Sequence, residues 1–275
     1  MPGFVLSREV FVIISALIEE RVGIHYELSD LTLLQDRIAP RAMEAGFDSL
    51  LDYYYYLRYD PASAPEFDRL VEALVVGETY FFREFDQVRA LVEHVIEPKV
   101  AAGHRPKIWC AACSTGEEPL SLAMLLDDRG VLSKVDLLAT DLSRKALTRA
   151  QSGRFSRRSL RQVPEPRLAE RWLIEGPDGV DIRPGLREKI SWSRINLLDP
   201  QAVARLAPCD VILCRNVLIY FTEETARRVV DSLARALAPG GALLVGVSES
   251  ILRFGAGLTC EERGGAFIYN KGGGA

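Results

Sequence analysis

The sequence is poor in histidine and cysteine and lacks long apolar runs, and each shortage excludes a class of protein. It has three His and five Cys among 275 residues. An odd number of cysteines in a chain of this length is typical of reduced thiols and argues against a disulfide framework. No stretch approaches the roughly 18 unbroken apolar residues of a membrane helix, and residues 1–4 lack the basic and apolar parts of a signal peptide. We therefore expect a cytoplasmic protein without membrane insertion.

An excess of positive charge is also missing. The formal net charge is −4 at pH 7, which argues against nucleic acid as a partner, because such binding depends on many Lys and Arg side chains facing phosphates. The charge is uneven: residues 1–80 hold six Lys and Arg against fourteen Asp and Glu, and the rest of the chain holds 28 against 24. The length indicates a small domain beside a larger one, and the acidic front part is typical of a solvated helical surface.

The front of the chain is predicted to be helical. Over residues 7–90, apolar positions recur at steps of three and four residues. Ser7 is a suitable helix start, and Gly23 and Gly46 are suitable helix ends. We interpret the tyrosine run at 53–56 as packing between short helices rather than as a stacking platform, since four adjacent helical residues point all round the axis.

After residue 106, short apolar runs alternate with amphipathic segments. The expected strands are 107–112, 135–140, 190–195, 211–214, 242–247 and 266–270, and the expected helices are 119–128, 143–152 and 223–237. This alternation predicts a doubly wound α/β sheet of the Rossmann type. Proline and glycine interrupt the pattern at about 156–190, which indicates an inserted excursion. We expect a helical N-terminal domain at 1–88 and a sheet domain at 89–275.

Polar residues follow four of the expected strands, at the edge where open parallel sheets bind ligands. They are the segment 111–119 after the first strand, Asp141 after the second, Asn196 and Leu197 after the third, and Arg215 and Asn216 after the fourth. A carboxylate at Asp141 suits ribose hydroxyls, and an amide beside a leucine suits the edge and face of adenine. A single such Asp or Asn is more often a helix cap or a turn former, so it is their conjunction that indicates a nucleoside site.

Nicotinamide cofactors and S-adenosylmethionine both remain possible for such a site. The segment Ser114-Thr115-Gly116-Glu117-Glu118 is not G-x-G-x-x-G, so it does not provide the close backbone approach that a pyrophosphate needs. A cofactor without phosphates is favoured. No metal is expected, because the pair Cys110 and Cys113 has no second pair or neighbouring His, and no G-x-S-x-G elbow is present.

Five segments, in this order, resemble the CheR-type chemotaxis receptor methyltransferases. They are Gly77-Glu78-Thr79-Tyr80-Phe81-Phe82-Arg83-Glu84, Ala111-Ala112-Cys113-Ser114-Thr115-Gly116-Glu117-Glu118-Pro119, Ala139-Thr140-Asp141, Asn196-Leu197-Leu198 and Cys214-Arg215-Asn216-Val217-Leu218-Ile219-Tyr220-Phe221. The resemblance spans nearly the whole chain. It implies a class I methyltransferase sheet, a helical N-terminal domain and a small antiparallel β-subdomain at about 156–190. It further implies S-adenosylmethionine as donor, S-adenosyl-L-homocysteine as product, and glutamates on cytoplasmic receptor helices as acceptors.

The resemblance also assigns site residues. The implied cofactor contacts are Gly77, Thr79, Arg83, Glu118, Asp141, Asn196, Leu197, Arg215 and Asn216. The implied catalytic pair, which bounds the methyl-transfer site, is Arg83 and Tyr220. The family commonly has Asn where this chain has Gly77, which offers only backbone groups. Two hypotheses therefore remain: an active protein-glutamate O-methyltransferase, and a cofactor-binding signalling module with little or no turnover.

Methyl transfer to a carboxylate fits a chain with so few histidines. A glutamate with a pKa of about 4.3 is already an anionic nucleophile near pH 7, so no general base is required. The protein must position the reactants, an effect that can supply roughly 7–11 kcal/mol. Arg83 can orient a carboxylate bidentately, and Tyr220 can steer the acceptor oxygen. The ordinary alternatives are a salt bridge of Arg83 with Glu84 or Glu117, and core filling by Tyr220.

The partner surface is the least determined feature. The family's N-terminal domain typically docks through a basic helix, but the segment 31–45 offers only two arginines against two acids, so docking there should be weak. Positive charge gathers instead at Arg144, Arg149, Arg154, Arg157, Arg158 and Arg161. This cluster is either a solvated helix end or a docking patch. The excursion from Trp172 to Trp192 is shorter than in relatives that bind a receptor's C-terminal tether, so we expect no dependence on a tether pentapeptide.

Overall fold

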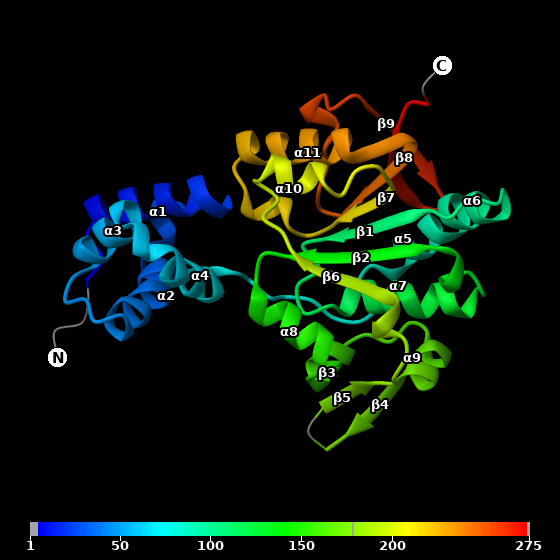
Figure 1. Cartoon of the computed structure of the whole chain (residues 1–275), viewed down its shortest axis with the longest axis horizontal. Coiled ribbons are helices and arrows are strands. Elements are labelled where there is room, and N and C mark those ends of the chain that lie inside the picture. The colour runs from blue at the N-terminus through cyan, green and yellow to red at the C-terminus, as the bar shows by residue number, and fades with distance from the viewer. Residues whose placement is uncertain (1–4, 178, 274–275) are drawn as a thin grey trace. The chain divides into compact units, whose positions relative to one another are not determined.

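The computed structural model describes residues 5–177 and 179–273, which form two compact units (Figure 1). The helical unit comprises residues 5–76 together with Tyr220–Thr225. The sheet unit comprises the described parts of Gly77–Ile219 and of the chain from Ala226 onward. The domain limits 1–88 and 89–275 stay a prediction. In the described residues, no helix has both the length and the apolar character needed to cross a membrane.

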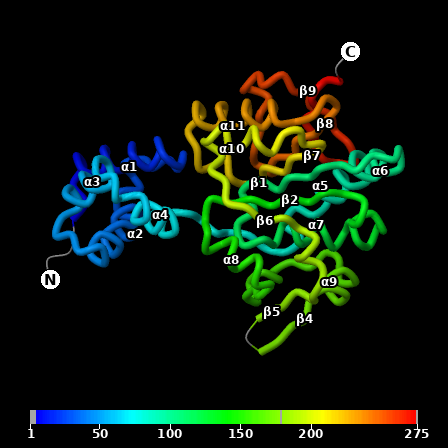
Figure 2. Tube along the Cα trace, viewed as in Figure 1, coloured from blue at the N-terminus to red at the C-terminus, as the bar shows by residue number. Residues whose placement is uncertain are grey.

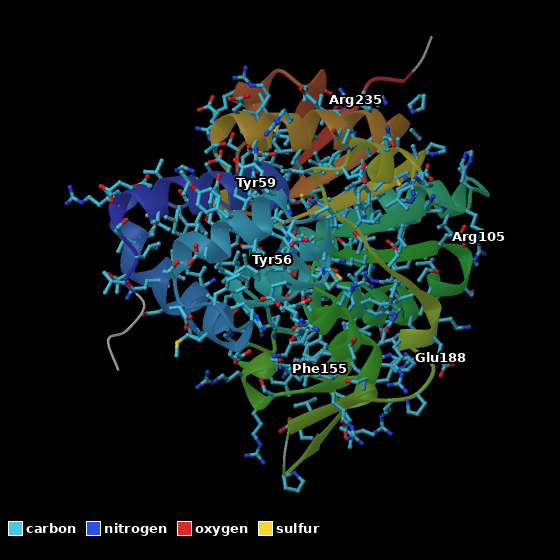
Figure 3. The ribbon with its side chains drawn as sticks, turned by 60° about the vertical axis from the view of Figure 1, so that its left-hand side comes forward. Tyr56, Tyr59, Arg105, Phe155, Glu188 and Arg235 are labelled. Carbon is cyan, nitrogen blue, oxygen red and sulfur yellow. The ribbon has the colours of Figure 1, made fainter. Side chains whose placement is uncertain are left out.

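Four α-helices build the helical unit as its sequence periodicity predicts. They are α1 (Arg8–Val22), α2 (Leu31–Glu44), α3 (Leu50–Tyr59) and α4 (Ala64–Leu74). Ser7 caps α1 by accepting the Val10 N–H, and Gly23 ends it at a φ of 82°. Within α3, Tyr53 is fully buried whereas Tyr55 is 51% exposed, and Figure 3 shows Tyr56 and Tyr59 on the same helix. The tyrosines therefore surround the helix axis.

A seven-stranded sheet forms the centre of the sheet unit, in the order β6-β2-β1-β7-β8-β10-β9. Its strands are β1 (Lys107–Ala111), β2 (Asp136–Asp141), β6 (Ile190–Arg194), β7 (Cys209–Cys214), β8 (Leu237–Val245), β9 (Leu258–Arg263) and β10 (Ala266–Lys271). The pairs among the first five are parallel, whereas β10 runs antiparallel to β8 and β9. Figure 2 follows the chain through these strands. The expected α/β sheet is confirmed, with an antiparallel pair at one edge that includes the unexpected β9.

Helices cover this sheet and bury its strands. They are α5 (Phe85–Leu91), α6 (Glu97–Ala101), α7 (Glu117–Asp128), α8 (Arg144–Ser152), α10 (Pro200–Ala204) and α11 (Glu223–Ala236). A π-helical turn at Val92–Ile96 joins α5 to α6. Both α7 and α8 pack on β2, and α5 packs on β10. Four of the five residues of β1 are buried, as expected for a parallel strand covered on both faces.

The inserted excursion is a small antiparallel sheet, as expected. Its strands are β3 (Arg154–Phe155), β4 (Leu173–Gly176) and β5 (Gly179–Ile182), with β5 in the middle. It also contains a helix, α9 (Pro166–Trp172), which was not predicted because the sequence there is rich in proline. Because Pro166 occupies the first helical position, it starts this helix rather than breaking it.

Candidate functional site

The four strand ends singled out in the sequence lie side by side. Ala111 at the end of β1 pairs with Thr140 of β2 and with Cys214 of β7, and Asp141 pairs with Arg194 at the end of β6. The loops that leave these strands therefore start along one edge of the sheet. This arrangement brings together Glu118, Asp141, Asn196, Leu197, Arg215 and Asn216 around the carboxyl ends of the strands.

Asp141 ties two of these loops together. One carboxylate oxygen accepts the Ser114 N–H at 2.7 Å and the other accepts the Ser143 N–H at 2.9 Å. Ser114 belongs to the loop after β1, and Ser143 is the N-cap of α8. The carboxylate thus fixes the loop after β1 against the start of the helix that follows β2.

Gly77 lies beside this loop and leaves room there. A Cβ placed on Gly77 would lie 3.8 Å from the Ser114 Oγ, an ordinary contact distance. Among the described residues, that Oγ is buried and has no hydrogen-bond partner. A buried hydroxyl without a partner is costly, and a ligand polar group can satisfy it. Gly116, by contrast, has no such room, because a Cβ there would lie 2.6 Å from the Ala150 Cβ.

Arg215 is the centre of a buried charge cluster. Its side chain is 1% exposed. One terminal nitrogen donates to Glu118 at 2.7 Å, and the other donates to Glu84 and to the Arg83 carbonyl, both at 2.9 Å. Its Nε is buried and lacks a partner in the part of the chain that the structure describes. The cluster joins the segment 77–84 to the first turn of α7 and to the loop after β7.

The two carboxylates of this cluster differ in pKa. Burial raises the pKa of Glu118 above its ordinary value, although Arg215 acts in the opposite direction. Burial also acts to raise the pKa of Glu84, but Arg215, the Asn216 amide and the Val247 N–H together lower it below its ordinary value. The Arg215 charge is therefore shared between a readily ionised carboxylate and one that burial makes harder to ionise.

Sequence reasoning missed two carboxylates that shape the loop after β7. Glu84 accepts the Asn216 amide at 3.2 Å and the Val247 N–H at 3.2 Å. Glu249 accepts the backbone N–H groups of Asn216, Leu218 and Gly246, at 2.7, 2.8 and 2.8 Å. Glu84 follows no expected strand, whereas Glu249 lies two residues after the expected strand 242–247, so the signal used to choose candidates could have found Glu249 but not Glu84.

Backbone strain is concentrated in these same loops. The non-glycine residues with positive φ, among those described, are Phe82, Glu84, Ala112, Ser114 and Asn216. Each lies in the segment before α5 or in a loop after β1 or β7. Residues in such conformations each cost about 1–3 kcal/mol and gather at functional sites, where the surrounding contacts hold them.

Arg83 and Thr79 belong to a segment anchored at its apolar residues. The Phe82 N–H donates to Ser121 Oγ at 2.9 Å, and the Phe81 N–H donates to the Ser159 carbonyl at 2.8 Å. Arg83, partly exposed, donates to the Glu78 carbonyl at 3.0 Å. The carboxylates that would make it an ordinary salt bridge have other partners: Glu84 binds Arg215, and Glu117 accepts from Thr115 and Ser159.

The remaining predicted residues lie in two places. The Asn196 side chain accepts the Leu198 N–H at 3.0 Å, which shapes the loop after β6, and the Leu197 side chain beside it is buried. Tyr220 belongs to the helical unit, where its carbonyl accepts the His25 N–H at 2.9 Å. The pairing of Tyr220 with Arg83 stays a prediction.

The chemistry of these residues fits a nucleoside with an amino-acid tail. The site offers carboxylates and an amide for hydroxyl and amino groups, and the unpartnered Ser114 Oγ and Arg215 Nε for acceptors on a ligand. No glycine-rich pyrophosphate turn precedes α7.

Comparison with known proteins gives the same reading over nearly the whole chain. Residues 77–261 match the family described as CheR methyltransferase, SAM binding domain, and residues 9–75 match CheR methyltransferase, all-alpha domain. Chemotaxis protein methyltransferase 2 of Vibrio cholerae serotype O1 is 36% identical over 241 residues, which are 85% of this chain and 83% of that protein.

Two proteins of Pseudomonas aeruginosa are also similar. Chemotaxis protein methyltransferase 1 is 31% identical, over 88% of this chain and 90% of its own length. A probable biofilm formation methyltransferase, WspC, is 34% identical over 86% of this chain but only 56% of its own length. The family matches and the sheet confirm both the predicted family and its cofactor. The chain belongs to the CheR methyltransferase family and is an S-adenosylmethionine-dependent methyltransferase with a class I fold.

Proposed function

We propose that the chain methylates glutamate side chains on the cytoplasmic helices of chemoreceptors, yielding a methyl ester and S-adenosyl-L-homocysteine. The Arg215 cluster carries this proposal. It joins the Arg83 carbonyl and Glu84 to Arg215 and Glu118, so the segment that holds one residue assigned to the acceptor shares a buried network with two residues assigned to the cofactor. The names of the relatives, chemotaxis protein methyltransferases, support the receptor as substrate.

The proposed cofactor contacts are the residues that the family resemblance assigns. Asp141 accepts ribose hydroxyls at the end of β2, and Asn196 and Leu197 meet the edge and face of the adenine. Glu118, Arg215 and Asn216, with Gly77, Thr79 and Arg83, surround the amino-acid part of the ligand. Bound S-adenosylmethionine supplies an electrophilic methyl group: the acceptor oxygen forms the new C–O bond, the C–S bond breaks, and its electron pair stays on sulfur.

The chain's own residues have only to bind the cofactor and the acceptor carboxylate, orient them, and exclude water. The acceptor carboxylate is ionised at neutral pH, so no residue has to remove a proton. Arg83, held against the Glu78 carbonyl, presents its remaining donors for a bidentate contact with the acceptor carboxylate. The resemblance gives Tyr220 the role of directing the acceptor oxygen. In-line positioning of this kind can lower a barrier by roughly 7–11 kcal/mol.

A binding module without turnover is not favoured, because the curated relatives are named as methyltransferases. The space beside Gly77 further indicates that the absence of a side chain at this position does not disturb the loop after β1. Independence from a tether pentapeptide stays part of the proposal. Calorimetric titration with the pentapeptide checks it, and measurable binding would refute it.

Methyl transfer from radiolabelled S-adenosylmethionine to receptor cytoplasmic fragments tests the function. We expect base-labile label, as from a carboxyl methyl ester, and a loss of about 100-fold in turnover for Arg83→Ala, since misplaced reactants can cost that much. Arg105→Ala is the control, because Arg105 (labelled in Figure 3) lies before β1 and pairs with Asp136, the first residue of β2. Base-stable label, or full activity of Arg83→Ala, would contradict the proposal.

A further inference from the structure

We propose that Arg161 is a positioning residue for Arg83 and acts on it through Glu78 and Tyr80. We call these four residues the Tyr80 cluster. The inference rests on the proposed function, in which Arg83 orients the acceptor carboxylate. Arg161 lies outside the five segments that resemble the family, and it belongs to the arginine group at 144–161 whose role the sequence leaves open.

Two contacts hold the Arg83 guanidinium, and neither is an ion pair. One terminal nitrogen donates to the Glu78 carbonyl at 3.0 Å. The guanidinium carbon lies 5.7 Å from the centre of the Tyr80 ring, inside the limit of about 6 Å for a cation–π contact. Because the Arg83 side chain is also partly exposed, its orientation depends on how firmly Glu78 and Tyr80 are held.

Arg161 holds both of these residues. Its guanidinium pairs with the Glu78 carboxylate at 2.6 Å and lies 4.3 Å from the centre of the Tyr80 ring, closer than Arg83 does. The hydrogen bond from Arg161 lowers the pKa of Glu78 below its ordinary value, so the carboxylate is ionised at neutral pH and the pair persists. One guanidinium therefore restrains the two residues that Arg83 contacts.

Arg161 is itself fixed against the segment that carries Arg83. It directly follows a 3₁₀ turn, Arg157–Leu160, to which its backbone N–H is bonded. Within that turn the Ser159 carbonyl accepts the Phe81 N–H at 2.8 Å, and the Ser159 hydroxyl donates to the buried Glu117 at 2.8 Å. The turn therefore presents Arg161 beside Tyr80, the residue that precedes Phe81.

The contacts of Arg161 contribute more to orientation than to stability. The side chains of Arg161 and Glu78 are 41% and 56% exposed, and exposed ion pairs add little to the free energy of unfolding. Cation–π contacts at exposed sites are similarly weak. We therefore expect removal of Arg161 to leave the fold intact while Arg83 loses a fixed direction.

Arg161→Ala in the full-length protein tests the proposal. The turnover number should fall about tenfold, because small misplacements of reacting groups are costly. The KM for the receptor fragment should change less than about twofold, and the melting temperature should stay close to that of the wild type. Arg161→Lys keeps the charge beside Glu78 and Tyr80 and should recover most of the turnover. Arg157→Ala is the matched control, because Arg157 donates to the Gly176 carbonyl at the end of β4.

A double variant separates an action through Arg83 from a general effect. In the Arg83→Ala background, Arg161→Ala should cost no further turnover, since a residue that acts only through Arg83 has nothing left to position. A further tenfold loss there, or full turnover of Arg161→Ala alone, overturns the proposal.

Failure of the proposed function has a different signature. If the wild type transfers no methyl group, or if Arg83→Ala keeps full activity, the proposed function fails, and nuclear magnetic resonance judges the link between the arginines instead. The Nε–H resonance of Arg83, assigned by its loss in Arg83→Lys, should shift in Arg161→Ala and stay in place in Arg157→Ala. An unshifted resonance in Arg161→Ala, or an equal shift in both variants, overturns the link.

Discussion

Arg215 determines the electrostatics of the site, because a fully buried guanidinium needs nearby anions. Glu84 and Glu118 supply them, while the Arg83 carbonyl takes a further N–H. Removing one partner of a buried pair is costly because it leaves the other charge uncompensated. The same cluster connects residues of three sequence segments, at 83–84, 118 and 215.

The two carboxylates should give opposite pH dependences of stability. The lowered pKa of Glu84 means that its contribution is complete above its ordinary value of 4.5 and is lost as pH falls through the pKa of the folded state. The raised pKa of Glu118 means that stability falls as pH rises from 4.5 through its folded-state pKa. Glu84→Gln should cost about 2 kcal/mol near pH 7, and less in acid.

Urea unfolding of wild type, Glu84→Gln and Glu118→Gln between pH 4 and 7.5 measures these differences. The deficit of Glu84→Gln should shrink towards low pH, whereas Glu118→Gln should gain on the wild type as pH rises. Parallel curves for the two variants would show that the shifts do not have the stated directions.

Gly77→Asn should strengthen cofactor binding. The position has room for a Cβ at 3.8 Å from the Ser114 Oγ, and its φ is not positive, so a side chain enters without strain. An added amide can hydrogen-bond the ligand or the unpartnered hydroxyl, which is worth about 1 kcal/mol, or roughly fivefold in affinity. Calorimetry with S-adenosyl-L-homocysteine measures this. Gly77→Ala fills the same space without an amide, so equal affinities for the two variants would refute the explanation.

At the level of elements, Glu249 should maintain the loop after β7. Its carboxylate accepts three backbone N–H groups from that loop and from the end of β8. Glu249→Gln replaces one acceptor oxygen by a donor, so at least one buried N–H loses its partner at a cost of about 1–3 kcal/mol. Thermal unfolding and titration with S-adenosyl-L-homocysteine should both register the loss. A variant with reduced stability but full affinity would show that the loop is held by other contacts.

The sequence predicts the elements whose burial pattern is simple. Strands β1 and β7 end in the apolar runs 108–111 and 211–214, so their ends, and the polar residues after them, could be located closely. Strand β9 alternates partly buried and exposed residues and starts after a glycine, which gives no such signal. Glu84 could not be predicted as a site residue, because its partners Arg215, Asn216 and Val247 come from distant segments that only the folded sheet brings near.

At the scale of the whole molecule, the segment Tyr220–Thr225 belongs to the helical unit although it directly follows the loop after β7. Glu19 of α1 holds it: one oxygen accepts the Thr222 hydroxyl at 2.9 Å, and the other lies 2.9 Å from His25 Nδ1. The His25 N–H in turn donates to the Tyr220 carbonyl. The helical unit therefore fixes the backbone that carries Tyr220, in addition to any role in partner binding.

Glu19→Ala should separate the positioning of Tyr220 by the helical unit from a role of that unit in partner binding. If Tyr220 directs the acceptor oxygen, loosening its segment should lower turnover about tenfold, because small misplacements of reacting groups are costly. The affinity for S-adenosyl-L-homocysteine and the KM for the receptor fragment should stay unchanged, since the strand-end loops are untouched. Glu20→Ala is the matched control, as Glu20 lies next in α1 but pairs with the exposed Arg58. Equal losses of turnover in both variants would mean that α1 acts through overall stability, and the link from Glu19 to Tyr220 would then have no part in catalysis.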